Sequence, residues 1–378
     1  MLDPLVLPFF RNRSWRSGRL ALIVLATLAA CSPPEPVRIG FIGGLSGRVA
    51  DLGISGRNGT ILAAELRNQN GGIRGRPIEV IVEDDQQDPE LAREAVARLL
   101  ARRVDVIIGP MTSAMAVAVV DQANAGRIPM ISPTVTTNAL TGLDDHFFRV
   151  VAPTATHVFR SADYQFNRQH VRRAVLVCDR RNQAYTESWA GDFRKAFTAL
   201  GGKVVAEMGF ESSDALAALA RQILAEKPDG VVIVANSVDT ALLVQRIRLI
   251  DPDVPVATAE WAATERLIEL GGKAVEGLVV AQYLDRQSTA PAYLAFHRAY
   301  RERFAQEPGF AGLTAFDATN VAIEALASRT DEQTLKQALL AHGDFAGAQS
   351  PIRFDASGDT LRDTFLAVVR DGRFEPIR

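Results

Sequence analysis

Hydroxyl side chains gather after two predicted strands in the first third of the chain. Thr112 and Ser113 follow one strand, and Thr134 and Thr136 follow the next. Both segments are expected at the carboxyl ends of parallel strands, where open α/β sheets bind ligands. Hydroxyls beside the free amides of a helix N-terminus suit a carboxylate. Each segment could also serve only as a helix cap, and the sequence leaves both interpretations open.

Three further polar or aromatic residues follow predicted strands later in the chain. Tyr185 opens a helix after one strand, Asn236 follows another, and Glu260 follows a third. A glutamate in a loop is usually only solvated. A glutamate that faces hydroxyls across a cleft would instead receive an ammonium or hydroxyl group of a ligand.

Two other polar or glycine-rich segments do not indicate a cofactor or a metal. The glycine-rich segment 40–47 follows the first strand, but its spacing differs from the G-x-G-x-x-G of dinucleotide-binding turns. The acidic run 83–90 ends the second strand, and alternating strand positions point apart, so its oxygens would not converge on an ion. Asp88 before Pro89 predicts a helix N-cap with proline at the first helical position.

Catalytic arrangements are not indicated either. The chain has no G-x-S-x-G elbow and no histidine spacing for a metal, and it has only five histidines. His157 is nearest to the predicted cleft and is expected in a crossover or at a rim, not as a base. Cys178 lies in an apolar run and is expected to be a small core residue. An enzyme is therefore the least favoured class.

The elements that position these residues alternate between strand and helix. Strands are predicted at 37–42, 78–82, 104–108, 128–131, 173–177, 203–206, 230–234, 254–258 and 363–369. Helices are predicted at 54–68, 89–102, 113–125, 157–169, 185–200, 213–226, 237–249, 291–306, 313–328 and 331–342. This alternation is typical of βαβ units with parallel sheets. Two successive series of about four strands favour two α/β lobes over one wide sheet.

The N-terminus resembles an export signal. Arginines precede an uncharged run at 20–30, which is too short to span a membrane and ends at Cys31. Residues 28–31 resemble a bacterial lipobox, which predicts a signal peptide over 1–30, acylation of Cys31 and a short tether over 31–36. The alternative is an ordinary signal peptide with a chance cysteine. The formal net charge of −2 and the absence of a basic stripe exclude a nucleic-acid partner.

Five segments, in order and at this spacing, resemble the leucine/isoleucine/valine-binding proteins, the type I periplasmic solute-binding receptors of branched-chain amino-acid ABC transporters. They are residues 39–47, 70–75, 84–89, 108–113 and 131–136. The resemblance implies two Rossmann-like lobes joined by three crossovers, with ligand in the cleft between them. It predicts a first lobe of 37–153 plus 283–357 and a second lobe of 154–282 plus 358–378.

The resemblance also implies roles for single residues. Ser113, Thr134 and Thr136 fall where the family's first lobe holds the ligand carboxylate and part of the ammonium. Glu260 falls on the ammonium-binding acid, and Tyr185 on an aromatic residue that closes over the ligand. Leu52 and Asn236 fall on positions where relatives contact the side chain of the ligand.

Leu52 and Asn236 stand where the branched-chain binders often have aromatic residues, and His157 lies in a crossover segment where they have an aspartate. The ligand side chain is therefore left open. We expect a monomeric, lipid-anchored receptor outside the cytoplasm that presents an amino acid or related carboxylate to an ABC permease and its ATPase, without a cofactor. A sensor that reports to a signalling partner is the alternative.

Overall fold

Short β-branched runs form a first, entirely parallel sheet in the computed structural model, which describes residues 34–377. Its strands are β1 (Val37–Gly43), β2 (Ile78–Asp84), β3 (Val106–Ile108), β4 (Met130–Ser132) and β5 (Phe147–Arg149), in the order β2-β1-β3-β4-β5. The predicted signal peptide, Cys31 and the start of the tether lie outside the described residues. Among the described residues, no helix is long and apolar enough to cross a membrane.

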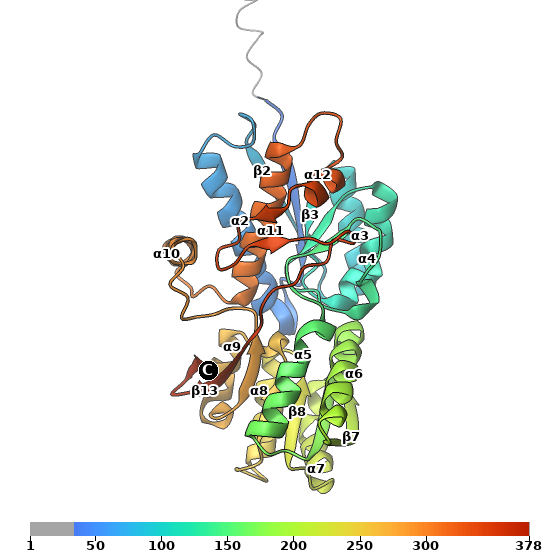
Figure 1. Ribbon diagram of the computed structural model, residues 1–378, viewed down its shortest axis with the longest axis vertical. Helices are drawn as coiled ribbons and strands as arrows, with labels where there is room; N and C mark the ends of the chain where they lie inside the picture. Colours follow the sequence, from blue (N-terminus) through green and yellow to red (C-terminus); the bar gives the residue numbers. More distant parts are fainter. Residues whose placement is uncertain (1–33, 378) are drawn as a thin grey trace, which may run out of the picture. The chain divides into compact units, whose positions relative to one another are not determined.

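Helices cover both faces of this sheet and form the first lobe with it (Figure 1). They are α2 (Ala50–Gln69), α3 (Pro89–Ala101), α4 (Ser113–Gly126), α10 (Pro291–Phe304), α11 (Phe310–Ser328) and α12 (Leu335–Ala341), with a small hairpin of β11 (Asp344–Phe345) and β12 (Ile352–Arg353). Successive strand residues point to opposite faces, so Phe41 belongs to the core that includes α2 residues and Ile42 to the core that includes α3 and α4 residues.

The contact between α2 and α11 joins segments that are far apart in the sequence (Figure 1). A Cβ atom on Gly59 would lie 2.1 Å from the carbonyl oxygen of Gly312. Only glycine therefore allows the two helix backbones to come this close.

A second sheet of seven strands forms the second lobe. Its order is β14-β13-β10-β9-β8-β6-β7, with β6 (Arg173–Asp179), β7 (Lys203–Phe210), β8 (Gly230–Val234), β9 (Val256–Thr258), β10 (Val279–Gln282), β13 (Phe365–Arg370) and β14 (Arg373–Pro376). Its helices are α5 (Thr154–Asp163), α6 (Gln183–Ala199), α7 (Leu216–Ala225), α8 (Ser237–Arg248) and α9 (Glu265–Gly271). The strands from β7 to β10 are parallel, whereas β13 and β14 add two antiparallel edge strands.

Two α/β lobes with parallel sheets confirm the predicted fold class. The chain passes between the lobes three times, from β5 to α5, from β10 to α10 and from β12 to β13. The residue boundaries of the lobes, 37–153 plus 283–357 and 154–282 plus 358–378, stay a prediction.

The third crossover is tied to the first lobe by a buried ion pair. The Arg149 guanidinium is fully buried, and its Nε donates to the Asp359 carboxylate over 2.7 Å. Burial lowers the pKa of Arg149, and Asp359 opposes that shift. The same guanidinium donates to the carbonyl of Thr137 and the hydroxyl of Thr141. One side chain thus joins the end of β5 to the segment that leads into β13.

Several local predictions can be compared with the elements directly. Asp88 caps α3 as predicted, accepting hydrogen bonds from the amides of Glu90 and Leu91. Cys178 is buried, and burial raises its pKa to about 12. The predicted helix over 331–342 is wrong at its start, because α12 begins only at Leu335, after a capping box of Thr334 and Gln337.

Candidate functional site

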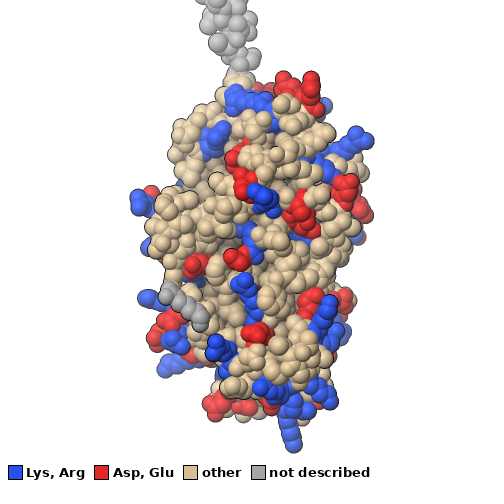
Figure 2. Space-filling model, viewed as in Figure 1, with Lys and Arg blue, Asp and Glu red and all other residues tan. Residues whose placement is uncertain are grey.

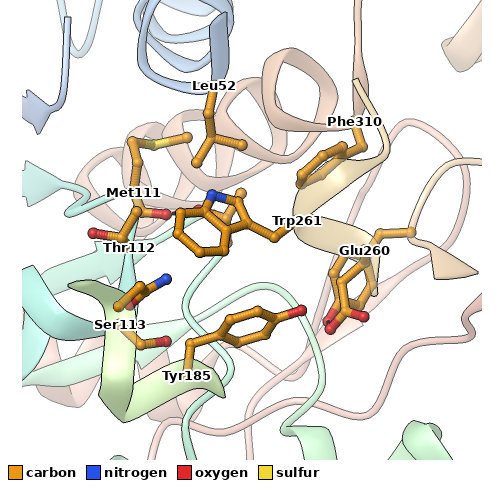
Figure 3. Close-up of a pocket in the computed structure, with 11 residues that line it drawn as sticks. Leu52, Met111, Thr112, Ser113, Tyr185, Glu260, Trp261 and Phe310 are labelled. Carbon is orange, nitrogen blue, oxygen red and sulfur yellow. Dashed lines mark hydrogen bonds between the residues drawn. The ribbon is translucent and has the colours of Figure 1, made fainter. Parts of the chain in front are cut away.

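A small pocket lies between the two lobes, where the carboxyl ends of both sets of parallel strands meet (Figure 3). About 280 Å³ of space there is not filled by atoms, and part of it is open to solvent. The lining residues of the pocket come from both lobes and are Leu52, Met111, Thr112, Ser113, Thr134, Asn182, Tyr185, Glu260, Trp261, Tyr283 and Phe310.

The first lobe contributes the N-terminus of α4 to this pocket. Ser113 is the first residue of the helix, and the preceding Thr112 makes no side-chain cap. Helix N-termini carry unpaired amides and a partial positive charge, so this end favours an anion. Thr134 reaches the same region and donates its hydroxyl to the carbonyl of Met111 over 2.6 Å.

One α4 amide is already bonded to the opposite lobe. The backbone amide of Ala114 donates to Oδ1 of Asn182 over 2.9 Å. Asn182 lies at the end of a short 3-10 turn between β6 and α6. The two lobes are therefore joined at the edge of the pocket.

Glu260 provides the only acidic side chain among the described lining residues, and buried donors surround it. His157 Nε2 and the Tyr283 hydroxyl each donate to Oε1 over 3.0 Å, and Trp189 Nε1 donates to Oε2 over 3.0 Å. Burial acts to raise the pKa of Glu260, but His157 and the other donors outweigh it, and the net shift is downward. Glu260 is thus held as a carboxylate.

Two aromatic side chains of the second lobe close the pocket. The Tyr185 and Trp261 rings meet edge to face, with centroids 5.8 Å apart. Both side chains are buried, and neither the Tyr185 hydroxyl nor Trp261 Nε1 has a hydrogen-bond partner. In Figure 3, the Tyr185 hydroxyl points toward Glu260. Burial, and then the charge of Glu260, raises the pKa of Tyr185 well above its usual value.

The remaining wall is apolar. Leu52 comes from α2, Met111 from the loop before α4, and Phe310 from the first position of α11. Figure 3 shows the Trp261 indole between this wall and Tyr185. The pocket therefore combines an apolar wall with a polar end at α4.

A search against family models matched the periplasmic binding protein family over residues 36–373. The chain belongs to this family. Its members bind solutes, so this periplasmic binding protein is not an enzyme. No group of three or more metal-ligating side chains occurs among the residues that the structure describes.

Curated relatives of this periplasmic binding protein confirm the resemblance to Leu/Ile/Val-binding proteins. The Leu/Ile/Val-binding protein BraC3 of Rhizobium johnstonii is 22% identical over 87% of this chain and 90% of its own. A leucine-, isoleucine-, valine-, threonine- and alanine-binding protein of Pseudomonas aeruginosa is 23% identical over 91% and 93%.

Solved structures share the fold. LivJ of Streptococcus pneumoniae, a branched-chain amino-acid transporter substrate-binding protein in complex with isoleucine, aligns with a TM-score of 0.83 and 23% identity, over 90% of this chain and 98% of its own. A solute-binding protein of an R. palustris ABC transporter, in complex with benzoate, aligns with a TM-score of 0.82 and 21% identity, over 91% and 96%.

Five of the seven residues predicted for this periplasmic binding protein line the pocket. They are Leu52, Ser113, Thr134, Tyr185 and Glu260. Thr136 and Asn236 are not among the lining residues. Thr136 is fully buried, and its hydroxyl has no hydrogen-bond partner.

Asn236 has a different environment from the one the resemblance implies. Its Oδ1 caps α8 by accepting from the amide of Asp239, and its Nδ2 donates to the carboxylates of Asp179 and Asp239. Arg181 bonds the same two carboxylates. Asn236 is thus part of a charged cluster and not of the pocket lining.

Other lining residues were not predicted as site residues. Asn182, Tyr283 and Phe310 come from a turn, a crossover and a helix start, and none follows a predicted strand directly. Trp261 neighbours Glu260 in the sequence, which is a signal that could have been followed. The position of the other three depends on how the lobes meet.

Proposed function

We propose that this periplasmic binding protein is the solute receptor of an ABC transporter and delivers an amino acid or related small carboxylate to its permease. The observation that carries the proposal is the pocket at the carboxyl ends of the parallel strands of both sheets. Its buried Tyr185 hydroxyl and Trp261 indole nitrogen have no protein partner. Buried polar groups are nearly always paired, so these two atoms favour a missing ligand.

Binding proceeds by closure of the two lobes. The ligand docks on the first lobe at Ser113 and Thr134, with Thr136 behind them, and the second lobe then brings Tyr185 and Glu260 against it. Hinge closure of this kind stabilises the closed state by the difference in ligand affinity between the two states. Asp51 supports closure, because its carboxylate accepts hydrogen bonds from two second-lobe hydroxyls.

A thermal-shift screen tests the receptor role. Amino acids, short aliphatic acids, aromatic acids and amides are each added to the purified protein. A molecule that binds only the native state raises the melting temperature. A screen in which every small acid and amino acid leaves the melting temperature unchanged contradicts the proposal.

Ser113→Ala tests the docking end of the pocket. We expect calorimetry to show binding weaker by roughly 1–3 kcal/mol with an unchanged fold, because the ligand anion loses a hydrogen-bond donor. Ser328→Ala, which changes an exposed serine at the end of α11, is the matched control. Equal affinities for both variants argue against this docking site.

We also propose that acylated Cys31 anchors the receptor to a membrane outside the cytoplasm. The support is the lipobox-like sequence at the end of an uncharged run. Cys31→Ser should move the protein from the membrane fraction to the soluble fraction and abolish labelling by a radioactive fatty acid. An unlabelled, soluble wild-type protein indicates an ordinary signal peptide instead.

Delivery to a permease and the monomeric state have direct tests. The liganded receptor should stimulate ATP hydrolysis by its transporter in proteoliposomes, whereas the unliganded receptor should not. Sedimentation should give the mass of a single chain. On the face shown in Figure 2, Lys and Arg side chains are interspersed with Asp and Glu side chains.

A further inference from the structure

Donors of the protein already fill most acceptor positions of the Glu260 carboxylate. It accepts hydrogen bonds from His157, Tyr283 and Trp189, and all three donors are buried. A carboxylate offers about four lone-pair positions, so about one remains. Little acceptor capacity is therefore left for a ligand.

His157 supplies the positive charge that balances Glu260. Its Nδ1 lies 3.0 Å from the carbonyl oxygen of Pro153, and its Nε2 lies 3.0 Å from Oε1 of Glu260. Both partners accept hydrogen bonds and neither can donate one. The Tyr283 hydroxyl also lies 3.3 Å from Nε2, but it donates its hydrogen to Glu260 over 3.0 Å. Both ring nitrogens of His157 therefore carry hydrogen. An imidazole with two N–H groups is a cation. The pair is buried, so its charges compensate each other within the protein.

We infer that His157 takes the place of a ligand ammonium group, so that the pocket selects small carboxylates without an α-amino group. This inference rests on the proposed receptor function and narrows its ligand class. An amino acid in the same position would bring its ammonium beside the His157 cation and find most acceptor positions of Glu260 filled. Two positive charges that lie side by side in a buried site repel each other strongly.

The rest of the pocket fits this ligand class. The α4 N-terminus and Ser113 suit the carboxylate of the ligand. The unpartnered Tyr185 hydroxyl and Trp261 Nε1 can donate hydrogen bonds to it. Leu52, Met111 and Phe310 form an apolar wall. This wall suits a compact apolar group such as a branched chain or a single ring.

Matched ligand pairs test the selection. Calorimetry compares 4-methylpentanoate with L-leucine, and 3-phenylpropanoate with L-phenylalanine. The members of each pair differ only in the α-amino group. We expect the amine-free acid of at least one pair to bind at least tenfold more tightly than its amino-acid partner. Tighter or equal binding of the amino acid in every pair that binds overturns the inference.

Two variants test the role of His157. His157→Gln keeps a donor for Glu260 but removes the positive charge, and the preference for amine-free acids should fall at least fivefold. Tyr283→Phe frees one acceptor position of Glu260 and should shift the preference in the same direction. His297→Gln is the control, because His297 pairs with Glu307 and does not line the pocket.

The outcomes separate this inference from the receptor proposal. A ligand preference that stays the same in folded His157→Gln and Tyr283→Phe proteins overturns the role of His157, whereas the receptor function still holds. Binding of neither member of any pair, in the wild type and under all conditions, contradicts the ligand class. If the broader screen also finds no ligand, the receptor function itself is contradicted.

Discussion

Asn182 of the second lobe accepts a hydrogen bond from the backbone amide of Ala114 in the first lobe, over 2.9 Å. This bond exists only when the lobes are together, and it occupies the first turn of α4. It therefore contributes to the closed state directly. Other bonds between the lobes join Ser188 to Thr137 and Asp192 to Asn138, so Asn182 is one of several closing contacts.

Asn182→Ala should weaken ligand binding about two- to tenfold, because one hydrogen bond of the closed state contributes about 0.5–1.5 kcal/mol. Calorimetry gives the affinity, and small-angle scattering gives the proportion of closed molecules. Asn167→Ala is the control, because Asn167 bonds only Asp163 in its own lobe. Tighter binding by the Asn182 variant would instead indicate that Asn182 competes with the ligand.

Gly59→Ala should destabilise the protein by roughly 1–3 kcal/mol, because the added methyl group collides with the backbone of α11. Alanine normally stabilises a helix relative to glycine. The destabilisation expected for Gly59→Ala therefore comes from the close contact between α2 and α11. Gly191→Ala in α6 meets nothing within 4 Å and should stabilise the protein slightly. Urea denaturation of both variants measures the difference.

Asp85 makes stability depend on pH. Burial is the main cause that raises its pKa from 3.8 to about 6, and one of its carboxylate oxygens has no partner. An acid with a raised pKa binds its proton more tightly in the folded protein. The resulting stabilisation is complete below about pH 3.8 and is lost as the pH rises through about 6.

Asp85→Asn should therefore raise the free energy of unfolding at pH 7.5 by roughly 1–3 kcal/mol and change it little at about pH 4. Melting temperatures across this pH range give the comparison. The exposed Asp121→Asn variant is the control. A stability gain of equal size at both pH values would show that the Asp85 charge is not its cause.

Arg149 and Asp359 should show strong energetic coupling. Removing either partner leaves a buried charge unpaired, and Asp359→Asn or Arg149→Met should each cost about 3–5 kcal/mol. The double variant should lose at least about 1 kcal/mol less than the sum of the two single losses. Additive losses in urea denaturation would mean that the ion pair itself contributes nothing.

The fold was largely predictable because its signals are local. Alternating β-branched runs and amphipathic segments predicted most strands of both lobes, and Asp88 with Pro89 marked the start of α3. The strands β5, β10, β11, β12 and β14 were not predicted. Each has only two to four residues, which is too short for a clear local pattern.

The site was predictable where it follows strand ends. Ser113, Thr134 and Glu260 each stand at such an end and do line the pocket. Phe310 and Tyr283 reach it from segments that return late in the chain, so no local pattern marks them. The hydrogen bond between His157 and Glu260 was equally hidden, because the two residues are 103 positions apart in the sequence.

The last strands of the chain complete an earlier sheet. Because β13 and β14 close the edge of the second sheet beside β10, that edge stays unpaired during synthesis until residues 365–376 have emerged. The first lobe likewise lacks α11 until residues 310–328 have been made. A nascent chain therefore exposes a strand edge and an apolar helix groove at the same time. Protection by a chaperone matters most in that interval, and a chain that ends before β13 would keep the strand edge of β10 exposed indefinitely.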